Sequence, residues 1–373
     1  MKTNFVKLRW LFTMLLFVTT MIMPTMMLAK SIDLKIPEGD GAGTPYKIGT
    51  AEELYWFAGL VNGTLPGVKK DLSANAILTD DIIVNTGVLD PNKDLVSGND
   101  FIEWIPIGKS SSDDDAYTGT FDGNGHTISG LYFNKSNSWY VGLFGCIGTE
   151  GKISNVGVSD SYFQSSNCPY IGGVCGSNSG ELQNCSNSST VIGKENEYRI
   201  GGVCGYNYGG TIKSCYNTAS VSGQYSVGGV CGDNYEGPIT NCYYLSGTVA
   251  DGKGGIGGKD DENGKAVEMS KDRFKSGEVA WLLNGSKSVS TEESTLAWYQ
   301  KLGENADAYP VLKSTDHNTV YKAPLFSCDG TTRIGEYANK PEGDKLSHNY
   351  QMAEKADEGT SNLYSEECAI CHN

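Results

Sequence analysis

The sequence predicts an all-β protein, a right-handed parallel β-helix, and three observations support this fold class. First, the segment RIGGVCGYNYGGTIKSCYN, residues 199–217, recurs as YIGGVCGSNSGELQNCSN before it and as SVGGVCGDNYEGPITNCYY after it. Second, Cys175, Cys204 and Cys231 recur at intervals of 29 and 27 residues. Third, 48 glycines and 21 tyrosines, with few long apolar runs, suit short strands and many turns. Repeats this short bury a core only by stacking on one another.

Residues 1–29 have the pattern of a signal peptide, with predicted cleavage near Ala29. Lys2, Lys7 and Arg9 precede WLFTMLLFVTTMIM, an apolar run of 14 residues. This run is shorter than the roughly 20 residues that a membrane-spanning helix needs, and no run of similar length follows. The mature chain is therefore expected to be secreted or held at the cell surface, with no transmembrane segment.

The charge of the chain argues against nucleic acid as a partner. Lysine and arginine together number 29 against 44 acidic residues, which gives a net charge of −15. Loss of the three basic residues of the signal peptide would leave −18. A chain this negative repels the phosphate backbone of nucleic acids.

Residues 30–45 are expected to form a linker, and residues 46–250 a β-helix with an N-terminal cap. In TAEELYWFAGLVN, Thr50 and Glu53 form a capping-box pattern. Leu54, Phe57 and Val61 follow at helical spacing. We expect an amphipathic helix that covers the first coil, because an uncovered coil would expose its core and its strand edges.

The repeated cysteines are interpreted as apolar core positions. An earlier repeat, YVGLFGCIGTEGKISNVGV, aligns Phe144 with the first cysteine and Val156 with the second. A disulfide would leave no partner for phenylalanine, whereas free cysteine packs as a small hydrophobic side chain. We therefore expect two inward-facing columns of reduced thiols: Cys175, Cys204 and Cys231 in the first, and Cys185, Cys215 and Cys242 in the second.

Stacking should turn equivalent asparagines into ladders that run along the solenoid. Parallel strands place equivalent residues about 4.8 Å apart, and stacked Asn side chains can hydrogen-bond from coil to coil. One ladder is predicted at the turn that follows the first cysteine, and another beside the second cysteine. Their members are Asn178, Asn207 and Asn234, and Asn155, Asn184, Ser214 and Asn241.

Four segments resemble the GLUG repeat of bacterial surface proteins: GLFG at 142–145, and GVCG starting at 173, 202 and 229. YTGTFDGNGHTISGLYF at 117–133 and YKIGTAEELYWFAGLVNG at 46–63 are similar to segments that lead into such repeats. The resemblance spans residues 46–312. It implies a β-helix in a bacterial surface or secreted protein, since the repeat occurs in adhesin-like chains and beside the immunoglobulin A1 protease catalytic region.

Residues 251–314 are expected to form a linker followed by a C-terminal cap. DGKGGIGGKDDENGK is acidic and rich in glycine, which indicates a flexible link. SKDRFKSGEVAWLLNG and LAWYQKLGENADAYPVL then predict a helix and a pair of strands.

Residues 315–373 are predicted to be a separate small Cys/His module. ECAICHN contains CxxCH, the pattern of c-type haem attachment. The segment more closely resembles small C-terminal modules of bacterial surface proteins, and that resemblance implies a zinc site made by Cys328, His348, Cys368 and Cys371. Haem attachment, a disulfide and free thiols are the alternatives, and no other cofactor is expected.

Patterns that indicate catalysis are weak. The chain has four histidines, and none lies in an HExxH metalloprotease motif. β-Helix enzymes that cleave polysaccharides use carboxylates, for which the candidates are Asp80, Asp81, Asp113, Asp114, Asp115 and Asp122. Charge runs and Asp-Gly or Asn-Gly pairs at these places are also typical of solvated loops and turns.

Tyrosines in the repeats are the candidate binding residues. Tyr206 and Tyr208 flank Asn207, and Tyr235, next to Asn234, takes the place of Tyr208 in the following repeat. Aromatic rings beside amides suit contacts with a glycan or with a host or neighbouring-cell surface protein. The alternative is that they shield a turn. The function predicted from the sequence is non-catalytic binding or adhesion, with a polysaccharide lyase or glycoside hydrolase and a structural spacer as alternatives.

Overall fold

The computed structural model describes residues 30–97, 100–110, 114–167, 169–194, 199–250, 253–258, 264–285 and 296–313, and the backbone of 350–352 and 366–368. The chain divides into two units, residues 1–31 and 32–373, and the fold described below belongs to the second. The predicted signal peptide lies outside the described residues. The side chains of all four predicted zinc ligands do so as well.

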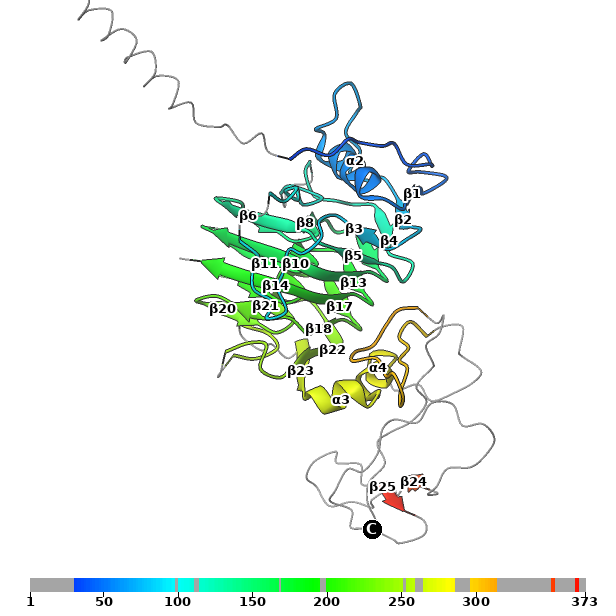
Figure 1. The fold of residues 1–373 in the computed structure, drawn as a ribbon, viewed down its shortest axis with the longest axis vertical. Helices are drawn as coiled ribbons and strands as arrows, with labels where there is room; N and C mark the ends of the chain where they lie inside the picture. Colours follow the sequence, from blue (N-terminus) through cyan, green and yellow to red (C-terminus); the bar gives the residue numbers. More distant parts are fainter. Residues whose placement is uncertain are drawn as a thin grey trace, which may run out of the picture. The chain divides into compact units, whose positions relative to one another are not determined.

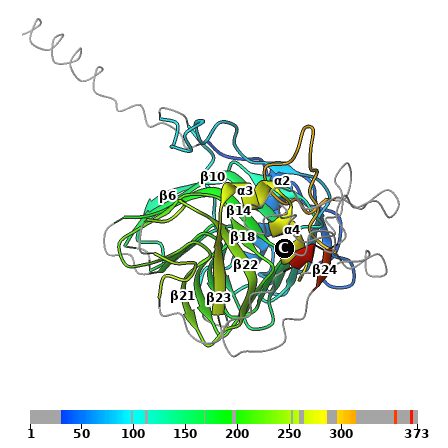
Figure 2. The same ribbon diagram turned by 90° about the horizontal axis from the view of Figure 1, so that it is seen from below.

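The strands of the repeats stack into a parallel β-solenoid of about seven turns, which confirms the predicted parallel β-helix. Figure 1 shows the strands layered along the stack, and Figure 2, turned by 90°, shows successive coils lying over one another. Most strands are short, because glycines and residues in the left-handed conformation turn the chain between them.

One column of the solenoid contains seven strands, each hydrogen-bonded to the equivalent strand of the next coil. In stacking order they are β1 (Tyr46–Ile48), β2 (Ala76–Leu78), β4 (Thr120–Asp122), β9 (Lys152–Ser154), β13 (Glu181–Gln183), β17 (Thr211–Lys213) and β22 (Ile239–Leu245).

A second column joins the first in one 15-stranded sheet, because β22 pairs with strands of both columns. Its strands are β3 (Ile82–Ile83), β5 (Thr127–Ser129), β10 (Gly157–Ser166), β14 (Ser186–Lys194) and β18 (Tyr216–Asn217). Three more strands pair at its side or end: β6 (Tyr132–Ser136), β19 (Val221–Ser222) and β23 (Gly264–Met269).

Two four-stranded sheets complete the coils. The first contains β7 (Tyr140–Val141), β11 (Tyr170–Gly172), β15 (Arg199–Gly201) and β20 (Ser226–Gly228). The second contains β8 (Phe144–Ile147), β12 (Cys175–Asn178), β16 (Cys204–Tyr208) and β21 (Cys231–Tyr235). All these pairings are parallel, and their register puts Cys175 beside both Cys204 and Phe144. The predicted alignment of the repeats is therefore confirmed.

The core changes in character along the stack. Early coils contribute aromatic side chains that are fully buried, among them Trp104, Tyr117, Phe121 and Phe144. Later coils fill the same interior with smaller side chains. These are a column of Ile153, Leu182, Ile212 and Ile239, and the two cysteine columns, all 0–1% exposed. Phe144 and Val156 are also completely buried, as an apolar slot requires.

The first predicted asparagine ladder forms, although it lies inside strands and not in a turn. Nδ2 of Asn178 donates to Oδ1 of Asn207 at 2.8 Å, and Nδ2 of Asn207 donates to Oδ1 of Asn234 at 2.8 Å. In the second, Nδ2 of Asn184 donates to Oδ1 of Asn155 at 2.9 Å, and its four members share a backbone conformation. The second ladder marks a corner at which all four residues have φ between 51° and 54°: Asn155, Asn184, Ser214 and Asn241. Asparagine tolerates this left-handed conformation better than most residues.

A helix, α2 (Ala51–Asn62), forms where the capping-box pattern predicts one. The Thr50 hydroxyl accepts a hydrogen bond from the Glu53 N–H at 3.3 Å, and Gly63 ends the helix with φ of 64°. Phe57 lies against Tyr117 and Phe121, with ring centroids 6.1 and 6.0 Å away. The helix thus packs on the first aromatic coils (Figure 1).

Residues 253–258 and 264–269 are not a flexible link, contrary to the expectation from sequence. Ile256 pairs with Cys231 and is 4% exposed, so KGGIG at 253–257 occupies the place that GGVCG takes in the preceding coils. β23 then pairs with β22. Glycine content alone was misleading here, because the repeat itself is rich in glycine.

The predicted C-terminal helix is divided into α3 (Lys271–Lys275) and α4 (Glu278–Leu283), because Gly277 between them has φ of 85°. The predicted strand pair is reduced to one antiparallel bridge between Tyr299 and Val311. Trp298 is fully buried, and its Nε1 donates to the Ser214 carbonyl at 3.2 Å.

In the last part of the chain, the structure describes the backbone of an antiparallel pair, β24 (Tyr350–Met352) and β25 (Glu366–Cys368). Among the described residues of the whole chain, no helix has both the length and the apolar character needed to cross a membrane.

Candidate functional site

The predicted tyrosines belong to a longer row of aromatic side chains. The tyrosine row consists of Tyr140, Tyr170, Tyr206, Tyr208 and Tyr235. It crosses four coils. Tyr140 and Tyr170 are register partners in one sheet, Tyr208 and Tyr235 are register partners in the next, and the ring of Tyr206 contacts both pairs. The ring centroids of Tyr140 and Tyr170 are 5.1 Å apart, those of Tyr170 and Tyr206 are 5.5 Å apart, and those of Tyr208 and Tyr235 are 5.4 Å apart.

The rings of the tyrosine row stack face to face, with interplanar angles of 10° to 18° for these three pairs. A stacked ring has its flat face covered by its neighbour, so the row presents ring edges and hydroxyls. Tyr208 and Tyr235 are 55% and 49% exposed. Among the described residues, the hydroxyls of Tyr206, Tyr208 and Tyr235 have no hydrogen-bond partner, which leaves them able to donate and accept.

Arg199 packs against two rings of the tyrosine row and forms an ion pair with Asp233. Cζ of Arg199 is 4.4 Å from the ring centroid of Tyr206 and 5.4 Å from that of Tyr170. Its Nε donates to Oδ2 of Asp233 at 2.7 Å. The ion pair neutralises the guanidinium and fixes its plane, so Arg199 supports the rings and adds little net charge to the surface.

Two residues predicted to bind ligand lie in the interior. Asn207 is 0% and Asn234 is 7% exposed. Nδ2 of Asn207 also donates to the Gly210 carbonyl at 2.7 Å, and Nδ2 of Asn234 donates to that of Gly237 at 2.9 Å. Their amides therefore hold the coil together, which corrects their assignment as contact residues. Strand alternation, which turns every second side chain inward, was the missed signal.

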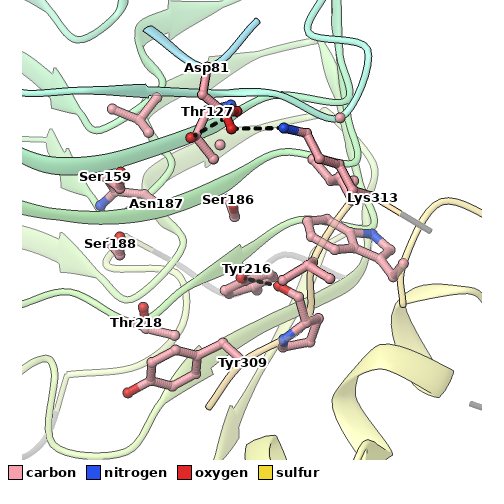
Figure 3. A pocket seen from close by; sticks show the side chains of 17 residues that line it. Asp81, Thr127, Ser159, Ser186, Asn187, Ser188, Tyr216, Thr218, Tyr309 and Lys313 are labelled. Carbon is pink, nitrogen blue, oxygen red and sulfur yellow. Dashed lines mark hydrogen bonds and ion pairs between the residues drawn. The ribbon is translucent and has the colours of Figure 1, made fainter. Parts of the chain in front are cut away.

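A separate pocket lies between the second strand column and residues 298–313, which we call the strap (Figure 3). Strands β5, β10, β14 and β18 supply its floor, and the strap supplies the opposite wall. The Tyr216 hydroxyl donates to the Pro310 carbonyl at 2.7 Å, and Lys313 Nζ is 2.8 Å from Oδ2 of Asp81. Sequence analysis did not identify this pocket, because its two walls are far apart in the chain.

Asp81 is held at the end of the pocket by several donors. The Thr127 N–H donates to Oδ1 at 2.8 Å, and His126 Nδ1 lies 3.3 Å from the same oxygen. Partial burial raises the pKa of Asp81, but the bonds from Lys313 and Thr127 outweigh it and leave the pKa lowered. Asp80, Asp81 and His126 have ligand atoms within 4.8 Å of one another, but both Asp81 oxygens already have protein partners.

The other catalytic candidates do not converge on the pocket. Asp122 accepts hydrogen bonds from Asn155 and the Asn124 N–H, at 3.0 and 2.8 Å, and so ends the corner ladder. Asp115 forms an ion pair with Lys70 at 2.6 Å, Asp114 offers its carbonyl to the same lysine, and Asp113 lies outside the described residues.

The cysteines of the two columns form no disulfide. All seven cysteines with described side chains are free and buried. Sγ of Cys175 is 3.7 Å from Sγ of Cys204, which is a contact and not a bond. Burial raises the pKa of Cys175, Cys204, Cys215, Cys231 and Cys242, so the thiolate needed for metal binding or nucleophilic attack is disfavoured.

Comparison with known proteins identifies a GLUG motif at residues 196–222, which is one coil of this solenoid from β15 to β19. Halomucin of Haloquadratum walsbyi is 41% identical over 71 residues, and a protein of Evansella cellulosilytica named "Putative Gly-rich membrane protein" is 33% identical over 76 residues. The matches cover 19% and 20% of this chain, but only 1% and 8% of these relatives.

Among solved structures, one named a "putative immunoglobulin A1 protease" from Bacteroides ovatus matches 74% of this chain and 98% of its own. Its sequence is 18% identical, and the TM-score is 0.39.

Proposed function

We propose that this chain is an exported protein whose solenoid acts as a non-catalytic binding module, with the tyrosine row as its contact surface. The observation that supports this most directly is a row of tyrosine rings in which two stacked pairs are fixed by the coil register and whose outer hydroxyls have no hydrogen-bond partner among the described residues. Rings that are already stacked lose little conformational freedom on binding, which favours affinity.

The partner that suits this surface offers polar groups at regular spacing, as a glycan or a protein of a host or neighbouring cell does. The surface exposes ring edges, so contacts would form through the hydroxyls and the rims of the rings. Export is supported by the signal-peptide pattern of residues 1–29. The similarity to the Evansella protein that is named a membrane protein agrees with a location outside the cytoplasm.

Two variants test the proposal. Tyr208→Phe with Tyr235→Phe removes two hydroxyls and keeps the stacked rings, whereas Tyr208→Ala with Tyr235→Ala removes the outer end of the row. Binding to a glycan array and to cell surfaces should fall in both, and more in the second. Tyr225→Ala, an exposed tyrosine outside the row (44% exposed), is the matched control.

Unchanged binding in the alanine pair would remove the tyrosine row from the function. No binding by the unaltered protein to any glycan or cell would instead support the spacer role. Release of reducing or unsaturated ends from a polysaccharide would favour an enzyme.

We also infer that the solenoid is right-handed and that its two ends are closed, by α2 at the first coil and by α3, α4 and the strap at the last. The closed ends are supported by apolar side chains of these elements, which are completely buried. Phe57 and Leu54 of α2 are 0% exposed, as are Phe274 and Trp298 at the other end. An experimental structure at side-chain resolution would test both points.

A further inference from the structure

The pocket beneath the strap has one wall of hydroxyls. Ser159, Ser188 and Thr218 belong to β10, to β14 and to the turn after β18, and register places them on successive coils. Figure 3 shows them one below another on the floor of the pocket. Among the described residues their hydroxyls have no hydrogen-bond partner. Each can donate and accept, which is the pairing that another hydroxyl needs.

The opposite wall is aromatic and aliphatic. Tyr309 and Leu312 of the strap face the pocket and are partly exposed there. The polar atoms deeper in this wall are already used, because the Tyr216 hydroxyl donates to Pro310 and the Trp298 Nε1 to Ser214. The strap therefore offers apolar contact, with the Tyr309 hydroxyl as an additional polar group.

The charges at the end of the pocket cancel. Asp81 and Lys313 form an ion pair at 2.8 Å, and Asp81 has a further donor in the Thr127 N–H. A charged ligand of either sign would have to compete with this pair. A neutral ligand leaves it intact and can still bond to its outer atoms.

The size of the pocket limits the ligand. Its volume is about 240 Å³, which corresponds to roughly eight waters at about 30 Å³ each. A single six-membered sugar ring fits such a space, whereas a disaccharide would have to extend beyond it.

From these features we propose that the strap pocket binds one neutral pyranose ring, with the ring hydroxyls on Ser159, Ser188 and Thr218 and the C–H face against Tyr309. This site is on another sheet of the solenoid from the tyrosine row and does not rest on the function proposed for it. A pocket that buries one ring implies weak binding, with a Kd of about 1 mM.

The test uses the full-length mature protein and the methyl glycosides of glucose, galactose, mannose and N-acetylglucosamine. Saturation-transfer NMR titration gives a Kd for each glycoside. Ser188→Val replaces the central hydroxyl by a methyl group and adds a second methyl, on a strand that tolerates β-branched residues, and affinity should fall about five- to tenfold. Ser188→Tyr fills the pocket and should abolish binding.

Ser222→Val is the matched control, because Ser222 is an exposed serine of β19 that does not line the pocket. Thermal unfolding of each variant shows whether it is folded. The Tyr208→Ala and Tyr235→Ala pair should retain glycoside binding, which separates this site from the tyrosine row.

Three results would overturn the proposal. The first is no binding of any of the four glycosides at 50 mM, about fifty times the expected Kd. The second is equal affinity in folded Ser188→Val and Ser222→Val. The third is tighter binding of methyl glucuronoside or glucosamine than of the neutral sugars, since that would show that the Asp81–Lys313 pair is not the barrier to charge inferred above.

Discussion

A cysteine of the first column is equivalent to the apolar residues that occupy the same slot in other coils. Cys175 pairs with Phe144 on one side and Cys204 on the other, and Ile256 pairs with Cys231 in the last coil. The exposed fraction is 4% for Ile256 and 0% for the other four side chains, which are Phe144, Cys175, Cys204 and Cys231. The slot selects burial and apolar character and not one fixed volume, since Phe144 and Ile256 share it with the cysteines.

Replacing Cys204 by alanine should therefore cost only a cavity, about 1 to 2 kcal/mol of unfolding free energy, and replacement by valine should cost less. Urea unfolding of the two variants measures this. Alkylation in denaturant without reductant, followed by intact-mass analysis, should label all six column cysteines. Failure of the six thiols to react would mean that the columns are cross-linked and that the slot interpretation is wrong.

Asn207 contributes more than a cysteine because it is polar, buried and linked on two sides. It accepts from Asn178 and donates to Asn234 and to the Gly210 carbonyl. Asn207→Ala should lower the unfolding free energy by about 3 kcal/mol, since the partners stay buried without their bonds. Asn92→Ala is the control. Asn92 is exposed, its φ is not positive, and its side chain has no hydrogen-bond partner among the described residues, so its loss should cost under about 0.5 kcal/mol. Similar losses would contradict the ladder as a source of stability.

At the scale of elements, α2 is fixed by an acidic residue near its N-terminus. Oε2 of Glu53 accepts from the Gly49 N–H at 2.9 Å, and Oε1 forms an ion pair with Lys35 at 2.7 Å. A capping box in the strict sense would bond back to Thr50, so the pattern predicted the helix start but placed the bond one residue too late. Burial raises the pKa of Glu53, yet Lys35 and Gly49 outweigh it and leave the pKa lowered.

Glu53→Gln should therefore destabilise the protein by about 1 to 2 kcal/mol at pH 7. A lowered folded-state pKa contributes stability above the unfolded value, about 4.3, and loses it as the pH falls through the folded value. The difference from the unaltered protein should thus shrink below about pH 4. Glu52→Gln removes the same charge from the same helical turn, where no side-chain bond is made, and should cost less and vary less with pH. A difference that is constant from pH 7 to pH 3 would show that the carboxylate is not the cause.

The elements of the repeat could be predicted because aligning the repeats shows which residues replace one another at the same position. Phe144 in a cysteine slot showed burial, and the spacing of Asn178 and Asn207 showed a ladder that the structure contains. The strap could not be predicted in the same way. Lys313 reaches Asp81 across 232 residues, and no local pattern reports a contact between segments so far apart.

Part of the tyrosine row could be predicted because its members recur with the repeat. Tyr206, Tyr208 and Tyr235 recur with the repeat, so their grouping followed from the period. The stacking that covers the ring faces, and the inclusion of Tyr170 across a corner, depend on the angle between two sheets. Periodicity carries no information on that angle. The pocket beneath the strap depends in addition on a segment outside the repeat.

At the scale of the whole molecule, the stability of each coil should depend on the coils next to it, because each coil contacts mainly its neighbours. Gly202 and Gly254 take equivalent places in two coils, because each lies two residues before the buried slot. Gly254 belongs to the last coil of the stack. A Cβ on Gly202 would overlap the Gly229 carbonyl and the Asn217 side chain. On Gly254 it would meet only the Ile256 carbonyl at 3.5 Å, an ordinary contact.

Gly202→Ala should accordingly destabilise the protein by about 3 kcal/mol, whereas Gly254→Ala should change it by under about 1 kcal/mol. Chemical unfolding gives the two free energies, and hydrogen exchange shows where each is felt. In Gly202→Ala, protection should fall in the coils on both sides, from β13 to β21, because the inserted methyl separates strands that must stay hydrogen-bonded in the stack. In Gly254→Ala the change should be confined to the last coil. Equal destabilisation by the two substitutions, or protection lost evenly over the whole chain, would contradict a stack held by contacts between neighbours.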